Sequence, residues 1–68
     1  MDVFSERLRE SLNANQMQQK ELAKKLGLSQ AVVNNYCLGK RRPSFEVLFQ
    51  ICKELDESAD YLMGLTDL

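Results

Sequence analysis

The sequence predicts an all-α fold, a compact bundle of five helices formed by one small domain. Apolar residues recur every three or four positions in successive stretches, as they do along the buried face of a helix. These stretches begin after Asp or Ser, or end before Gly, which are residues that start and stop helices. At 68 residues, the chain has room for a core of about a dozen side chains, so we treat residues 1–68 as a single domain.

The first helix is expected to follow Asp2, whose carboxylate can accept a hydrogen bond from the first turn. Phe4, Leu8 and Leu12 share one face and should be buried. The charged residues of this helix lie off that face and are expected in solvent: Glu6, Arg7, Arg9 and Glu10. A polar break follows at residues 13–16, where an asparagine can take a positive φ.

Residues 19–36, QKELAKKLGLSQAVVNNY, predict two short helices joined by a tight turn. Gly27 should end the first helix in the left-handed conformation, which costs glycine least. Ser29 should cap the second helix. Gln18 is a weaker cap for the first, so we expect that helix to start less securely. The apolar residues placed to pack around the turn are Leu22, Ala23, Leu26, Leu28 and Val33.

The second of these helices carries an outer face suited to DNA bases. Its inner face is expected to be Val33, Tyr36 and Cys37. A turn of about 100° per residue then places Ala31 and Asn35 outward, with Val32 and Asn34 on the flanks and Gln30 in the first turn. Amides can pair with both the donor and the acceptor of adenine, and small apolar side chains can meet a thymine methyl group. We therefore take Gln30, Ala31, Val32 and Asn35 as candidate base-reading residues.

A fourth helix should follow the cationic loop at residues 39–43, with Ser44 as its cap. Its predicted inward stripe is Phe45, Leu48, Ile51, Cys52 and Leu55. Val47 and Phe49 lie off that line and are expected to be partly exposed. Asp56 can end the helix in the left-handed conformation at modest cost.

A short fifth helix is predicted over residues 59–63, capped by Ser58 and ended by Gly64. Tyr61 and Leu62 should close the core. The last apolar residues have little chain left to cover them: Met63, Leu65 and Leu68.

Charge is distributed unevenly along the chain, although the net charge is only −1. Residues 19–42 carry a net charge of +5, residues 43–68 carry −5, and residues 1–18 carry −1. Because salt screens charges beyond about 8 Å, the local field near a contact surface governs attraction to phosphates. This asymmetry fits either a nucleic-acid surface or ordinary solvated surface, and charge alone does not decide between them.

Several functional classes are not expected. The longest uninterrupted apolar run is three residues, so we expect no membrane span and no signal peptide. Cys37 and Cys52 are far apart and the chain has no histidine, so no metal or cofactor is expected, and buried free thiols suit the cytoplasm. No nucleophile is spaced to pair with a base, so we do not expect an enzyme.

Residues 19–36, with GKRRPSFEVLFQICKEL and SADYLMG further along, resemble the phage-repressor and Cro-like (Xre-type) helix-turn-helix family. The resemblance implies a lambda-repressor-like domain of a prokaryote or phage that binds a double-stranded DNA operator and represses transcription. Helix 29–37 would enter the major groove. The resemblance also implies phosphate contacts by Gln19, Ser29, Asn34, Lys40, Arg41 and Arg42. It further implies a homodimer, with Met63, Leu65 and Leu68 as its contact.

The chain departs from the family pattern at two places. Leu12 and Cys37 stand where the family often has a buried arginine–glutamate pair, and replacing both charges together can be neutral or stabilising. We therefore expect these two residues to lie close together in the core. Glu57 and Ala59 replace residues that are usually larger and apolar, which argues against a strong dimer.

Two alternatives stay open. The chain could be a protein-interaction or antitoxin-like module that keeps the fold, in which case it would show no salt-dependent binding to any duplex. It could also be the N-terminal domain of a longer regulator.

Overall fold

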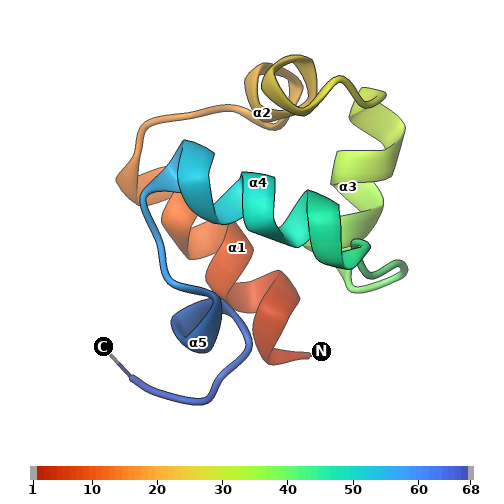
Figure 1. Cartoon of the computed structure of the whole chain (residues 1–68). Helices are drawn as coiled ribbons and strands as arrows, with labels where there is room; N and C mark the ends of the chain where they lie inside the picture. Colours follow the sequence, from red (N-terminus) through yellow and green to blue (C-terminus); the bar gives the residue numbers. More distant parts are fainter. Residues whose placement is uncertain (1, 68) are drawn as a thin grey trace.

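The structure, a computed structural model, describes residues 2–67 and contains five α-helices (Figure 1). Their bounds are α1 Val3–Ala14, α2 Gln19–Leu26, α3 Gln30–Leu38, α4 Phe45–Leu55 and α5 Ala59–Leu62. No strand occurs within residues 2–67. The all-α prediction is confirmed, and the fifth helix ends one residue earlier than expected.

The helix starts and stops are formed by the residues that the sequence marks for them. The side chains of Asp2, Ser29, Ser44 and Ser58 each accept a hydrogen bond from a backbone N–H in the first turn of the helix that follows. Gln18 makes no such bond, as expected for a weak cap. The residues that end α2, α3 and α4 in the left-handed conformation are Gly27, Gly39 and Asp56.

The core gathers side chains from all five helices. Its buried apolar residues are Phe4, Leu8, Leu12, Leu22, Ala23, Val33, Tyr36, Cys37, Leu48, Ile51, Leu55 and Leu62. α1 packs against α3 and α5, and α2 packs against α3 and α4. In Figure 1, α4 crosses in front of α1, while α3 stands at one side of the bundle. Leu12 and Cys37 are both buried in this core, and their predicted close contact stays a prediction.

One residue of the predicted α4 stripe is not buried. Phe45 is 86% exposed, although Leu48, Ile51 and Leu55 are buried as predicted and Cys52 is half-buried. At about 100° per residue, Phe45 points to the side of the stripe on which Phe49 lies. It is also the first residue of α4, so no preceding turn of the helix covers it.

Two arginines of α1 do not extend into solvent as expected. Arg7 donates hydrogen bonds to the carbonyl oxygens of Tyr61 (2.6 Å) and Thr66, and to Oδ1 of Asp67 (3.1 Å). Its guanidinium also lies 4.5 Å from the centroid of the Tyr61 ring. Arg9 donates to the carbonyl oxygen of Cys37. A long side chain can pass over the apolar surface and reach backbone acceptors on neighbouring elements, which helical periodicity does not reveal.

The break after α1 also differs in detail from the prediction. Gln16, and not an asparagine, takes the positive φ of 53°. Asn15 keeps a negative φ, and its amide donates to the carbonyl oxygens of Ser11 (2.8 Å) and Leu55 (3.3 Å). The asparagine therefore ties the end of α1 to the end of α4.

Candidate nucleic-acid interface

The α2–turn–α3 unit holds α3 at a fixed angle on the bundle. Gly27 ends α2 at φ 69°, and the N–H of Leu28 donates to the carbonyl oxygen of Ala23 (2.9 Å). Ser29 Oγ then accepts from the N–H of Val32 (3.2 Å), which fixes the start of α3. The end of α2 and the start of α3 thus both have hydrogen-bond partners for their terminal backbone groups, which favours this start of α3.

The inner face of α3 is buried as predicted. Val33 and Cys37 are fully buried and Tyr36 is 3% exposed, all within the core. At the end of the helix, the Arg9 guanidinium donates to the carbonyl oxygen of Cys37. A cation at this position interacts favourably with the negative end of the helix dipole. Burial raises the pKa of the Cys37 thiol, so the thiol stays protonated at neutral pH.

The outer face of α3 contains no charged residue. Gln30, Ala31 and Asn34 are exposed, whereas Val32 and Asn35 are half-buried. Asn34 is thus more exposed than predicted for a residue on the flank, and Asn35 is less exposed than predicted for an outward residue. Val32 packs partly against the core, so only part of its surface can contact a ligand. All four predicted base-reading residues keep accessible surface on this face.

Leu38, at the last position of α3, was not predicted as part of this surface. It is 48% exposed, directly before the glycine that ends the helix. The sequence carried a signal for it: with Val33, Tyr36 and Cys37 inward, a turn of about 100° per residue points Leu38 away from the core.

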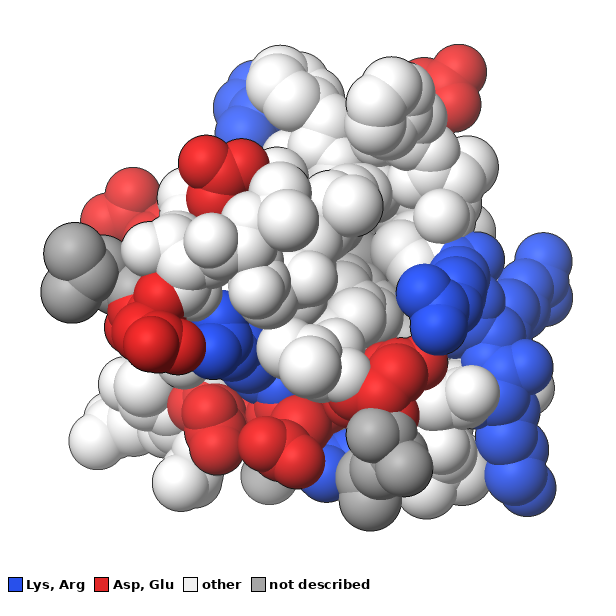
Figure 2. Space-filling view, turned by 90° about the horizontal axis from the view of Figure 1, so that it is seen from below, with Lys and Arg blue, Asp and Glu red and all other residues white. Residues whose placement is uncertain are grey.

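Cations flank α3 at its C-terminal end. Lys40, Arg41 and Arg42 are all exposed in the loop between α3 and α4. Figure 2 shows Lys and Arg side chains gathered along the edge of the molecule on which Figure 1 places this loop, with acidic side chains elsewhere on the same face. The predicted phosphate-binding cations therefore lie together, next to the end of α3.

Arg42 has a partner that the sequence did not suggest. Its Nη2 lies 3.3 Å from Oδ2 of Asp2, the residue that caps α1. The Asp2 carboxylate accepts a hydrogen bond from the N–H of Ser5 (2.8 Å), and this bond, more than the neighbouring Arg42, holds the pKa of Asp2 below its ordinary value. The same carboxylate therefore caps α1 and forms an ion pair with the cationic loop. Asp2 and Arg42 are 40 positions apart, so no local pattern could reveal the pair.

The remaining predicted phosphate contacts lie near the start of α2 and of α3. Gln19, the first residue of α2, is half-buried, and Ser29 is exposed. The Ser29 hydroxyl oxygen accepts from Val32, which leaves its own proton available for an acceptor outside the protein. Lys20 and Lys24 are exposed on α2, and Lys25 lies 3.9 Å from Glu54 of α4.

The structure describes two of the three C-terminal apolar residues that were predicted as a dimer contact. Met63 and Leu65 are 53% and 73% exposed, as predicted for residues with little chain to cover them. Leu68 lies outside the described residues. Within residues 2–67, no three His, Cys, Asp or Glu side chains are grouped so that they could hold a metal ion. None of the helices in that range has the length and apolar character needed to cross a membrane.

Known proteins resemble this chain in sequence and in fold. Residues 8–62 match the helix-turn-helix family. The uncharacterized HTH-type transcriptional regulator YqaE of Bacillus subtilis (strain 168) is 36% identical over 61 residues, which are 90% of this chain and 53% of YqaE. The uncharacterized HTH-type transcriptional regulator YobD of the same organism is 29% identical over 65 residues, which are 96% of this chain and 58% of YobD. The chain therefore spans little more than half the length of these relatives.

The solution structure of the DNA-binding domain of the P22 C2 repressor has the same fold. It superposes with a TM-score of 0.84 and 26% identity, covering 100% of this chain and 95% of the repressor domain. The sequence match spans both helices of the turn unit and most of the bundle around it. The chain therefore belongs to the helix-turn-helix family.

Proposed function

We propose that this chain binds double-stranded DNA in a sequence-specific manner and regulates transcription, most simply as a repressor. The observation that carries this function is the outer face of α3, which is uncharged, bears amides and is held away from the core beside a loop of three cations. An α-helix with such a face fits the major groove, which presents a distinct donor and acceptor pattern for each base pair. The names of the relatives and the repressor-like fold support the same function.

Within this function, the residues divide into two groups with different effects on specificity. Base edges would be read by Gln30, Ala31, Val32 and Asn35. Phosphates would be held by Gln19, Ser29, Asn34, Lys40, Arg41 and Arg42. Phosphate contacts fix the position of a protein on the duplex without reading its sequence. Two copies bound to half-sites about 34 Å apart would then give useful specificity.

A selection of random duplexes with the purified chain tests the function directly. We expect the recovered duplexes to share a half-site, and fluorescence anisotropy to show binding that weakens as salt rises, because phosphate contacts release counterions. If no duplex shows salt-dependent binding, the chain is instead a protein-interaction module that keeps the fold.

Substitution of Asn35 then tests the base-reading role. Asn35→Ala should cost about 1–3 kcal/mol of binding free energy on the selected half-site and little on random DNA. Gln50→Ala, which removes an exposed amide from α4, is the matched control and should leave both affinities unchanged. Equal losses on selected and random DNA would show that Asn35 does not read bases.

A further inference from the structure

The cationic loop at residues 39–43 lies against the start of α1. A Cβ added at Gly39 would lie 3.4 Å from Ser5 Oγ and 3.8 Å from Oδ2 of Asp2. At the other end of the loop, Arg42 lines a hollow together with Asp2 and the first residues of α1. The Asp2 side chain therefore lies beside both ends of the loop, which brings a carboxylate next to residues that are proposed to hold phosphates.

Asp2 is held in place by two hydrogen bonds with Ser5, which is fully buried. Oδ1 of Asp2 accepts from the N–H of Ser5 (2.8 Å), and the Ser5 hydroxyl donates to the carbonyl oxygen of Asp2 (3.0 Å). The other carboxylate oxygen, Oδ2, lies 3.3 Å from Nη2 of Arg42. Because the carboxylate is already ordered by the cap, the ion pair has to order only the arginine side chain, which lowers the entropy cost of a surface pair.

The Arg42 guanidinium remains open to ligands from solvent. The Arg42 side chain is 75% exposed, whereas the Asp2 side chain is 26% exposed. A phosphate that approaches from solvent therefore meets a cation whose charge is already offset by a fixed carboxylate. We propose that Asp2 competes with incoming phosphate groups for Arg42 and so limits how tightly the chain binds any duplex. Because Arg42 is one of the proposed phosphate contacts, this role of Asp2 rests on the proposed function.

Pairing with Asp2 changes the charge that the loop presents to DNA. Lys40, Arg41 and Arg42 together carry a charge of +3, and the Asp2 carboxylate reduces it to +2. Among the described residues, 2–67, Arg42 is the only one of these three cations in an ion pair. A protein that neutralises one phosphate fewer releases about one counterion fewer. The pair should therefore lower both the affinity for DNA and its dependence on salt.

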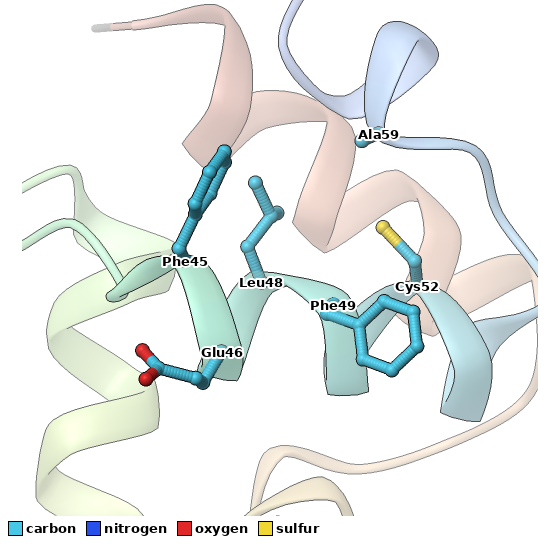
Figure 3. Close-up of a pocket in the computed structure, with 6 residues that line it drawn as sticks. All are labelled: Phe45, Glu46, Leu48, Phe49, Cys52 and Ala59. Carbon is cyan, nitrogen blue, oxygen red and sulfur yellow. The ribbon is translucent and has the colours of Figure 1, made fainter.

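Glu46 is the acidic residue nearest to the loop in the sequence, but its side chain has a different environment. It lies in the first turn of α4, where a carboxylate interacts favourably with the helix dipole. Leu48 lines the same hollow as Asp2 and Arg42, and Figure 3 shows Glu46 leaving α4 on the side opposite to Leu48. No ion pair joins Glu46 to the loop in the part of the chain that the structure describes. Glu46→Gln is therefore a matched control, because it removes a carboxylate from a helix start without removing a partner of Arg42.

Fluorescence anisotropy with a random duplex, at several salt concentrations, tests the competition. Asparagine caps a helix about as well as aspartate, so Asp2→Asn removes the charge and keeps the start of α1, which urea unfolding can verify. We expect Asp2→Asn to bind about two- to fivefold more tightly, as the loss of an exposed ion pair implies. The slope of log K against log salt should steepen by up to about one. In an Arg42→Gln background, Asp2→Asn should change neither quantity, whereas Glu46→Gln should have the same small effect with Arg42 or without it.

Two results would overturn this role of Asp2. One is an affinity of Asp2→Asn that stays the same or falls, and the other is an equal gain with and without Arg42. Calorimetric titration with long-chain inorganic polyphosphate separates this role from the proposed function, because it needs no DNA. If the wild type binds no duplex, but Asp2→Asn binds polyphosphate more tightly only where Arg42 is present, the proposed function is wrong and the role of Asp2 stands. If the wild type binds the duplex and Asp2→Asn binds it equally well, the role of Asp2 is wrong and the function stands.

Discussion

Gly64, which follows the Met63 cap of α5, should be the glycine least tolerant of a side chain. Its φ is +82°, and a Cβ added there would lie 2.8 Å from Cγ1 of Val3 on α1. Gly27 provides the matched reference, because its φ is +69° but a Cβ there would meet no atom within 4 Å. Gly64→Ala therefore has two costs, one conformational and one steric, and Gly27→Ala has only the first.

The two costs have different sizes. A left-handed conformation costs a non-glycine residue about 1–2 kcal/mol, offset in part by the smaller entropy of the unfolded chain. We expect Gly27→Ala to lower the free energy of unfolding by about 1 kcal/mol. Overpacking adds about 1–3 kcal/mol, and Val3 is 47% exposed and can shift, so the lower end applies. Gly64→Ala should then cost about 2–3 kcal/mol, or a fall in Tm of roughly 10–20 °C for a domain of this size.

Urea unfolding followed by circular dichroism measures these free energies, and Val3→Ala isolates the steric part. In Gly64→Ala/Val3→Ala the close contact is gone, so about 1 kcal/mol of the Gly64→Ala loss should return. Val3→Ala should not rescue Gly27→Ala. The reasoning is refuted if Gly64→Ala costs no more than Gly27→Ala, or if the Gly64 and Val3 substitutions are simply additive.

Three further predictions concern charged residues. Asp2→Ala should cost about 0.5–2 kcal/mol of stability through the lost cap, and Asp2→Asn much less. Because the folded pKa of Asp2 lies below its ordinary 3.8, the wild type should lose this stabilisation as pH falls below that value. Urea titrations at pH 3 and 7 should therefore show that Asp2→Ala loses less unfolding free energy between pH 7 and pH 3 than the wild type does. Arg7→Gln should raise the rate of amide hydrogen exchange at residues 61–67, because Arg7 binds the carbonyl oxygens of Tyr61 and Thr66. Glu6→Gln, on the exposed side of the same helix, should leave these rates unchanged. Arg41→Ala should weaken binding to all duplexes alike and lower the slope of log K against log salt by about one, and a loss confined to the selected duplex would contradict its phosphate role.

The helix boundaries could be predicted from sequence because they depend on neighbouring residues. A serine or aspartate side chain bonds a backbone N–H three residues along, as Ser29 does with Val32, and the spacing of the two residues is visible in the sequence. The left-handed ends at Gly27 and Gly39 follow equally from local preference. The buried face of α3 follows from its 3.6-residue period.

The errors concern residues whose environment is set by distant parts of the chain. The period of α4 includes Phe45 in its stripe, but Phe45 is the first residue of the helix and its ring is exposed. Arg7 looks like a solvated residue until the fold brings residues 61–67 beside α1. For the same reason, the Asp2–Arg42 pair could not be predicted, although each residue was singled out for its local role. In the candidate site, the residue types were predictable, but their relative exposure was not.

Contacts at the start, the inner face and the end of α3 hold it on the bundle. The proposed base readout requires α3 to be positioned within fractions of an ångström by its supporting contacts. Here Ser29 fixes the start of α3, three buried side chains fix its inner face, and Arg9 binds the carbonyl oxygen of Cys37 at its end. Arg9 approaches from a half-buried position on α1. Its charge meets the negative end of the α3 dipole, while Leu12 and Cys37 keep the core beneath it apolar.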